Sequence, residues 1–282
     1  MMHPDDMLEL APVAEEAGFE GIMLADHILV PAHFSSRYPY SESGEAPFDG
    51  TTPFPEVFAT IAALSQITTR LRFLTNVYVL PLRHPITIAK DVSTAAIFSK
   101  NRTVLGFGAG WLREEFESLE IPFAERGKRM DEQIPIIQAL LAGETVEAEG
   151  EYFSFGASRL SPLPTQKVPM WVGGMNPAAL RRAGQFGDGW TGAGSTFDQT
   201  VELLTEIASQ RKRFNREGEP FDCLVPLVEE ITPEKMQTLI ELGMTGTVSW
   251  PLDYLLPPGS TMQDKKDKLR ELGEVMIAPV ND

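Results

Sequence analysis

Short apolar runs alternate with amphipathic helical patterns along nearly the whole chain, and this alternation limits the possible folds more than any other feature. Such alternation is typical of a parallel sheet whose strands are joined by helical crossovers. The clearest helix is predicted over 125–142, where apolar residues recur on one face from Met130 to Leu141. Strands are predicted at 21–26, 71–79, 103–108, 169–174, 188–193, 223–228 and 246–250.

These elements predict an α/β fold of the (β/α)8 TIM-barrel type, formed by a single domain over residues 1–282. The chain opens on a helical pattern, "PDDMLELAPVAEEAG", whereas a barrel of this kind opens on a strand. The first strand is therefore expected to be missing from the numbered chain. Further helices are predicted at 54–67, 85–98, 176–186, 197–217, 233–242 and 262–276.

Two insertions interrupt the alternation. Residues 28–53 are rich in Pro, Ser, Gly and aromatic residues and follow the end of a predicted strand. Active sites of parallel barrels lie at that end of the strands, and long loops in compact domains are usually functional or disordered, so this segment is expected to cover the site. Residues 143–168 include "ETVEAEGEYFSF", two short alternating runs around a glycine, which predict a β-hairpin.

The charge and cysteine content exclude several classes of function. A formal net charge of −16 at pH 7 argues against binding to nucleic acid or to an anionic membrane through the overall field. The single cysteine, Cys223, permits no intramolecular disulfide and no cysteine-based metal site. With only four histidines in the chain, no metal centre is expected. The pattern favours a soluble cytoplasmic protein that acts on a small molecule.

The stretch "VLGFGAGWLREEF" (104–116) combines a strand-like run with closely spaced glycines. It does not match the dinucleotide fingerprint G-x-G-x-x-G, because Gly106, Gly108 and Gly110 alternate and Trp111 follows directly. Glycines this dense still permit a close approach of the backbone to another group. The acidic pair Glu114 and Glu115 is interpreted as favourable charge in the first turn of the next helix.

Polar residues at other strand ends have a functional and a structural interpretation. Asp26 and His27 would supply a general acid or a hydrogen-bonding electrophile, or would cap local backbone. Gly173 and Gly174 precede a helix that opens on "NP", which suits either an anion site or an ordinary tight turn. Arg83, with the histidine after it, would meet an acidic ligand or cap the next helix, and capping is favoured.

Four blocks appear in a characteristic order: "EEAGFEGIMLADHILVP", "PLRHPITIAKDVSTAAIFSKNRTVLGFGAGWLREEFE", "RGKRMDEQIPIIQALLAG" and "VPMWVGGMNPAALRRAGQFGDGW". Together they resemble the bacterial luciferase-like monooxygenase superfamily, and most closely its branch of probable F420-dependent oxidoreductases. The resemblance is close over residues from about 8 to 195 and looser beyond them. It implies a barrel that binds a flavin or deazaflavin at the carboxyl ends of its strands, and a homodimer.

The resemblance also implies roles for particular residues. An Asp-His pair beside the reacting ring matches Asp26 and His27, the predicted catalytic residues. A bulge against the ring, often with a non-proline cis peptide, falls in "LTNVY". Where several deazaflavin dehydrogenases carry a glutamate after the glycine loop, this chain has Trp111, so that role is not carried over. The cofactor-binding residues implied are Thr75 and Asn76 at the bulge, Gly108, Ala109 and Gly110 near the ring, and Gly173, Gly174, Met175 and Asn176 at the phosphate.

The function implied is hydride transfer between coenzyme F420 and a small organic substrate. One alternative keeps the fold but uses reduced FMN and oxygen, as a luciferase-like monooxygenase. Another is a degenerate barrel that binds a cofactor without catalysis, motivated by the missing first strand.

Overall fold

The centre of the protein is a parallel sheet. The computed structural model describes residues 2–249 and 251–278. Within them, seven strands pair in the order β1-β2-β4-β7-β8-β9, with β3 paired to β4, and every pair is parallel. The strands are β1 (Gly21–Leu24), β2 (Arg72–Thr75), β3 (Tyr78–Val79), β4 (Thr103–Gly108), β7 (Met170–Gly173), β8 (Gly189–Thr191) and β9 (Asp222–Leu224).

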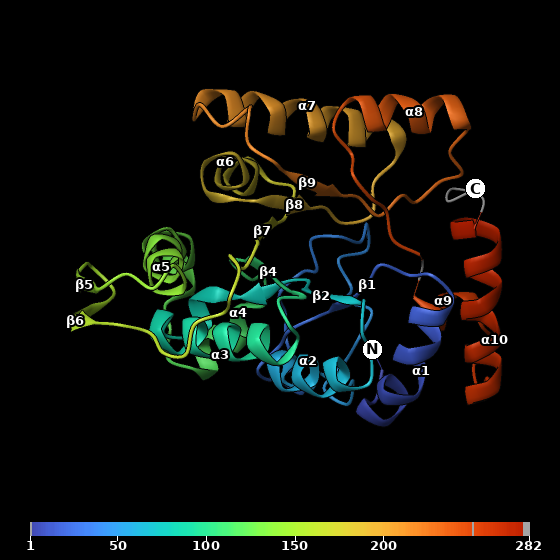
Figure 1. Ribbon diagram of the computed structural model, residues 1–282, viewed down its shortest axis with the longest axis horizontal. Helices are drawn as coiled ribbons and strands as arrows, with labels where there is room; N and C mark the ends of the chain where they lie inside the picture. Colours follow the sequence, from blue (N-terminus) through green and yellow to red (C-terminus); the bar gives the residue numbers. More distant parts are fainter. Residues whose placement is uncertain (1, 250, 279–282) are drawn as a thin grey trace.

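Helices surround the sheet on its outer side, as Figure 1 shows. Their order confirms the predicted strand-helix alternation. The predicted hairpin is confirmed as β5 (Val146–Glu149) paired antiparallel with β6 (Ser154–Ser158). The helices are α1 (Pro4–Glu16), α2 (Val57–Gln66), α3 (Pro85–Phe98), α4 (Arg113–Ser118), α5 (Arg126–Leu141), α6 (Pro177–Phe186), α7 (Phe197–Arg213), α8 (Pro233–Glu241), α9 (Leu252–Leu255) and α10 (Met262–Leu272).

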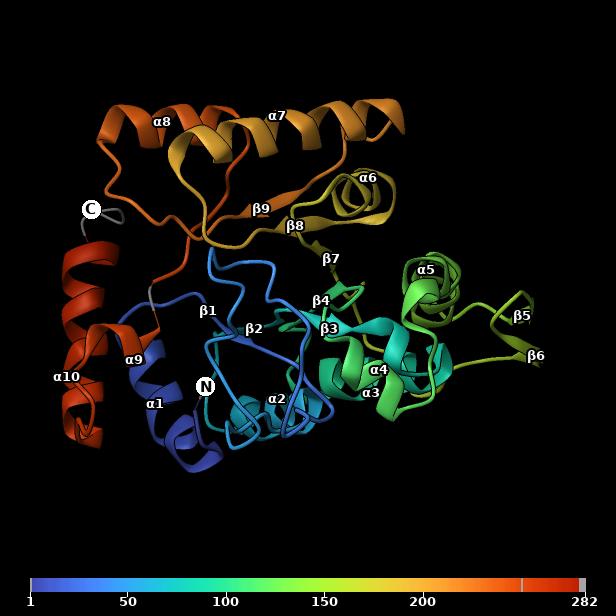
Figure 2. The same cartoon turned by 180° about the vertical axis from the view of Figure 1, so that it is seen from behind.

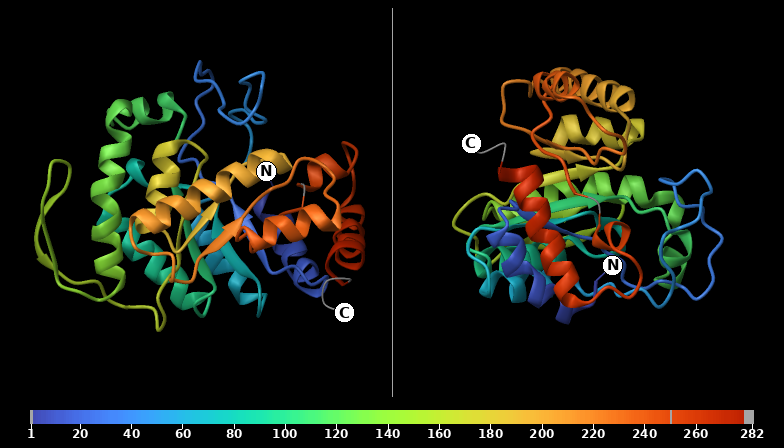
Figure 3. Two further views of the ribbon diagram at one scale, coloured as in Figure 1. Left: turned by 90° about the horizontal axis from the view of Figure 1, so that it is seen from above. Right: turned by 90° about the vertical axis from the view of Figure 1, so that its right-hand side faces the viewer.

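The sheet curves into a partial barrel with two edges. β1 forms one edge, and at the other Gly246 makes an isolated parallel bridge with Leu224. The prediction of a strand at 246–250 is therefore wrong for residues 246–249, which form this one bridge and no strand. Trp250 lies outside the described residues. A segment at the edge of a sheet hydrogen-bonds to one neighbouring strand, whereas an inner strand hydrogen-bonds to two. α10 packs against α1 beside this opening, through the ion pairs Lys265–Asp6 and Lys266–Glu9 (Figures 1 and 3).

The single strand predicted at 71–79 is divided into β2 and β3. The peptide bond between Asn76 and Val77, which lies between the two strands, is cis, as the family resemblance implies. Asn76 still donates its backbone N–H to the carbonyl of Leu24 at 2.7 Å, so the break stays attached to β1. The division turns the chain at the carboxyl end of the sheet, where the candidate site lies.

The alternating glycines are explained by packing between strands. A Cβ added at Gly106 would lie 2.0 Å from the carbonyl oxygen of Thr75. The side chain of Val77 fills the space beside Gly108 and Gly173. A Cβ added at Gly108 would lie 2.9 Å from that side chain, and a Cβ added at Gly173 would lie 2.2 Å from it. The glycines therefore admit the backbone and side chains of a neighbouring strand, which is a close approach of the kind that glycine permits.

Gly106→Ala is expected to lower the free energy of unfolding by about 3 kcal/mol, the upper end for an overpacked core, because the new methyl meets backbone rather than a movable side chain. Gly156→Ala is the matched control, since a Cβ there meets nothing within 4 Å. Urea unfolding of the two variants checks this, and equal stabilities would refute the packing explanation.

Candidate active site

The carboxyl ends of the parallel strands meet at one side of the sheet, and residues 28–53, here called the lid, cover them. The lid contains neither helix nor strand. Figure 2 shows it crossing in front of the strand ends, and Figure 3 shows it projecting from that side of the molecule. This is the position expected for an active site in a parallel barrel.

His27 follows β1 and is held by a carboxylate from a distant part of the chain. Its Nδ1 lies 2.9 Å from Oε2 of Glu115, and the two side chains are 8% and 1% exposed. The other oxygen of Glu115 accepts the backbone N–H groups of Ile28 at 2.6 Å and Leu29 at 3.4 Å. Glu115 does lie in the first turn of α4, as predicted, but the prediction missed its contacts.

Aromatic rings enclose the imidazole of His27. The centroids of Phe54, Phe48 and Trp111 lie 4.9, 5.1 and 6.2 Å from that of His27. Trp111 comes from the glycine loop and also contacts Tyr38 of the lid, at 5.2 Å between centroids. The site around His27 is therefore apolar and aromatic, with the lid supplying part of its wall.

Asp26 points away from this aromatic cluster and into a buried ion pair. Its two oxygens accept the guanidinium of Arg83 at 2.6 and 2.7 Å, and Oδ2 also accepts the backbone N–H of Val79 at 3.0 Å. Burial alone would lower the pKa of Arg83, but Asp26 outweighs it and the pKa is raised. The helix cap predicted for Arg83 and His84 is confirmed for His84, which caps α3 by accepting the N–H of Ile86, and is wrong for Arg83.

Glu114 fastens the lid. One of its oxygens accepts the backbone N–H and the hydroxyl of Ser35, at 2.7 and 3.0 Å, and the backbone N–H of Ser36 at 3.1 Å. Burial would raise the pKa of this carboxyl, but the hydrogen bonds from Ser35 and Ser36 outweigh it and lower the pKa to about 2. Glu114 is therefore ionised at neutral pH, and the signal for its role is an acidic pair directly after a loop at a strand end.

The Gly-Gly loop after β7 lies beside the lid. Gly174 has a φ of +112°, and a Cβ there would lie 3.8 Å from the hydroxyl of Tyr40 in the lid. Asn176 caps α6, with its side chain accepting the N–H of Ala179 at 3.0 Å. The sulfur of Met175 accepts the N–H of Ala193 at 3.3 Å, which ties this loop to the one after β8.

The remaining predicted residues lie at the ends of β2 and β4 or directly after them. The hydroxyl of Thr75 donates to the carbonyl of Gly106 at 2.7 Å, so that side chain is committed to the sheet. Gly110 has a φ of +79°, and its carbonyl accepts Nε of Arg126 at 3.2 Å. Ala109 packs against the core. The structure thus places all the predicted residues at or shortly after the carboxyl ends of β1, β2, β4 and β7, which are neighbours in the sheet.

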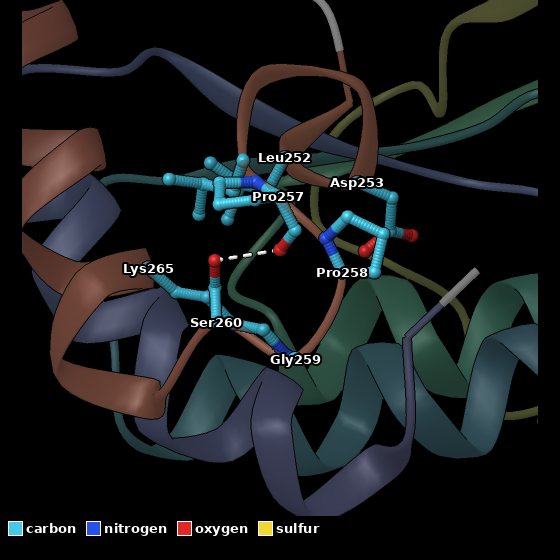
Figure 4. A pocket seen from close by; sticks show the side chains of 8 residues that line it. Leu252, Asp253, Pro257, Pro258, Gly259, Ser260 and Lys265 are labelled. Carbon is cyan, nitrogen blue, oxygen red and sulfur yellow. Dashed lines mark hydrogen bonds between the residues drawn. The ribbon is translucent and has the colours of Figure 1, made fainter.

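Two cavities lie away from the strand ends. One, of about 290 Å³, is lined by residues that include Leu252, Pro257 and Lys265, where the hydroxyl of Ser260 donates to the carbonyl of Pro257 at 2.7 Å (Figure 4). The other, of about 210 Å³, lies between α1 and α2 and is almost wholly apolar. Neither cavity is lined by a predicted site residue.

Within residues 2–249 and 251–278, no group of three or more His, Cys, Asp or Glu side chains is placed to hold a metal ion. No helix in the same part of the chain is long and apolar enough to cross a bilayer.

Comparison with known proteins identifies the family. A family model described as luciferase-like monooxygenase matches residues 2–231. An uncharacterized protein of Mycobacterium tuberculosis is 35% identical over 275 residues, which are 97% of this chain and 95% of that protein. The F420-dependent glucose-6-phosphate dehydrogenase of Microbacterium testaceum is 35% identical over 206 residues, which are 72% of this chain and 56% of that enzyme.

A solved structure shares the fold. The monooxygenase RslO1 from Streptomyces bottropensis superposes with a TM-score of 0.74 at 19% identity, over 99% of this chain and 94% of that one. The family model matches residues 2–231, and the mycobacterial relative is matched along nearly its whole length. The chain belongs to the luciferase-like monooxygenase family.

Proposed function

We propose that the protein is an oxidoreductase that transfers hydride between coenzyme F420 and a small organic substrate. The observation that carries this proposal is His27, a nearly buried imidazole at the end of a barrel strand, held by Glu115 and enclosed by aromatic rings. The relative from Microbacterium testaceum, named as F420-dependent, supports the choice of cofactor.

The residues present fit a deazaflavin cofactor. Aromatic side chains of the lid and Trp111 offer apolar surfaces to a planar ring, and the first turn of α6 offers a positive helix end to a phosphate. Gly173 and Gly174, with Met175 and Asn176, would hold that phosphate; Thr75, Asn76 and the stretch Gly108, Ala109 and Gly110 would line the ring. The bound deazaflavin would supply the ring carbon that carries the hydride.

The chain itself would orient, shield and supply a proton. His27 would exchange a proton with the reacting centre at Nε2, accepting it as a neutral imidazole and donating it as the cation, and its surroundings would exclude water. Asp26, committed to Arg83 and Val79, would hold the end of β1 in place rather than react. Because the side chain of His27 is 8% exposed, the lid must move before a ring can reach Nε2.

An FMN-dependent monooxygenase is the second candidate, favoured by the description of the family model. The two candidates differ in oxygen chemistry, because reduced flavin forms an oxygen adduct and reduced deazaflavin does not. Oxygen consumption is measured after adding the protein to reduced FMN, and in parallel to reduced F420. The proposal expects no oxygen uptake beyond the protein-free rate in either case, and uptake driven by FMN would favour the monooxygenase.

We also propose that the protein is a homodimer, as the family resemblance implies. Sedimentation velocity of the purified chain checks this, and a single species at the monomer mass would contradict it.

A further inference from the structure

We propose that Glu115 is a positioning residue that keeps a proton on Nδ1 of His27 and so presents Nε2 to the reacting centre. This inference rests on the proposed role of His27. A carboxylate only accepts hydrogen bonds, so the nitrogen 2.9 Å from Oε2 must be a donor. In a neutral imidazole, the proton on Nδ1 leaves Nε2 as the acceptor, and in the cation Nε2 is a second donor. In either form Glu115 fixes which nitrogen faces the site.

The second oxygen of Glu115 fixes the backbone that follows His27. It accepts the N–H groups of Ile28 and Leu29, the first residues of the lid. One carboxylate therefore sets both the rotation of the imidazole and the path of the chain beside it. With its side chain 1% exposed, Glu115 has little competition from water for these bonds.

Glu115 is also part of a buried group of charges. Burial lowers the pKa of Arg83, but the ion pair with Asp26 outweighs it, and Tyr78 and Glu115 raise the pKa further. Asp26 binds the guanidinium of Arg83, whereas Glu115 binds the imidazole of His27. Each carboxylate therefore has one ionisable side chain as a direct partner, and Arg83 does not compete with His27 for Glu115.

Glu115→Gln separates the two functions of this side chain. The amide has one oxygen and one NH2 group, and the N–H groups of Ile28 and Leu29 both need the oxygen. The NH2 group must then face Nδ1 of His27, which becomes an acceptor and carries no proton. The variant keeps the lid attached and moves the imidazole proton to Nε2. A purely structural role for Glu115 would leave the proton where it was.

The experiment is nitrogen NMR on the full chain with isotope-labelled histidine. The chain has four histidines, so four sets of imidazole signals must be resolved. His27→Ala assigns the signals of His27. We expect a protonated Nδ1 in the wild type and an unprotonated Nδ1 in Glu115→Gln. Glu114→Gln is the matched control, because it changes a neighbouring lid contact without touching His27, and its His27 signals should match the wild type.

An unprotonated Nδ1 in the wild type would overturn the inference, and this measurement needs no variant to fold. Unchanged signals in a folded Glu115→Gln would also overturn it. Turnover of Glu115→Gln with reduced F420 should fall by about 10²-fold or more, as expected when a catalytic histidine holds the wrong tautomer. If the wild type does not bind F420 but the proton moves as expected, the proposed cofactor fails and the positioning role stands.

Discussion

His27→Ala is expected to lower kcat with F420 by about 10²- to 10⁴-fold, the usual contribution of a positioned acid or base, while the cofactor Kd changes by no more than about threefold. The reason is geometric: the imidazole is fixed by Glu115 at the end of β1, whereas the residues proposed to hold the cofactor lie on other strands. Single-turnover kinetics and a binding titration separate these two quantities.

His33→Ala is the matched control for this prediction. His33 lies in the lid and is exposed, so its removal should leave kcat close to the wild-type value. If His27→Ala turned over at the wild-type rate, His27 would have no catalytic role. If it lost cofactor binding as strongly as turnover, His27 would be a binding residue.

Asp26→Asn is expected to lower the free energy of unfolding by about 3–5 kcal/mol, the range for breaking a buried ion pair from one side. The side chain of Asp26 is 3% exposed and that of Arg83 is 17% exposed, so the guanidinium would lose its charge partner in a place that water reaches poorly. Urea unfolding of the wild type and the variant measures the difference.

Two comparisons make this prediction specific. Glu9→Gln breaks a more exposed ion pair with Lys266 and should cost no more than about 1 kcal/mol. Adding Arg83→Met to Asp26→Asn removes the unpaired charge and should recover part of the loss. Equal costs for Asp26→Asn and Glu9→Gln would show that the buried pair contributes nothing special.

Local patterns predicted most of the architecture, because strand-helix alternation is repeated many times along the chain. α3 begins and ends at the predicted residues, where proline follows a capping histidine. The errors lie where local pattern is not decisive. The apolar run 71–79 reads as one strand but is divided at Asn76. Residues 246–249 contain the β-branched pair Thr247 and Val248, which is typical of a strand, but they lie at a sheet edge.

The candidate site was predicted only in part. Strand ends are readable from the sequence, so the positions of Asp26 and His27 followed from the barrel. Their partners were not readable, because Glu115 is 88 positions from His27 and Arg83 is 57 positions from Asp26. Pairings over such separations come from the way the strands are arranged in the sheet, and no local pattern encodes them.

The glycines show how one signal can have two sources. Their density pointed to a close approach, which is correct, but the approaching groups include Thr75 at the end of β2 and Val77 between β2 and β3. A sequence pattern that demands a small residue does not say whether protein or ligand fills the space. The glycine stretch supports the proposed cofactor site through its place at the end of β4, and its composition alone is explained by packing.

The most direct test of the proposed function is a side-by-side titration of the full chain with coenzyme F420 and with FMN, followed by fluorescence quenching. The proposed function predicts saturable, tight binding of F420 and much weaker binding of FMN, with His27→Ala close to the wild type in both titrations. Tight binding of FMN with weak binding of F420, or no saturable binding of F420, would contradict it.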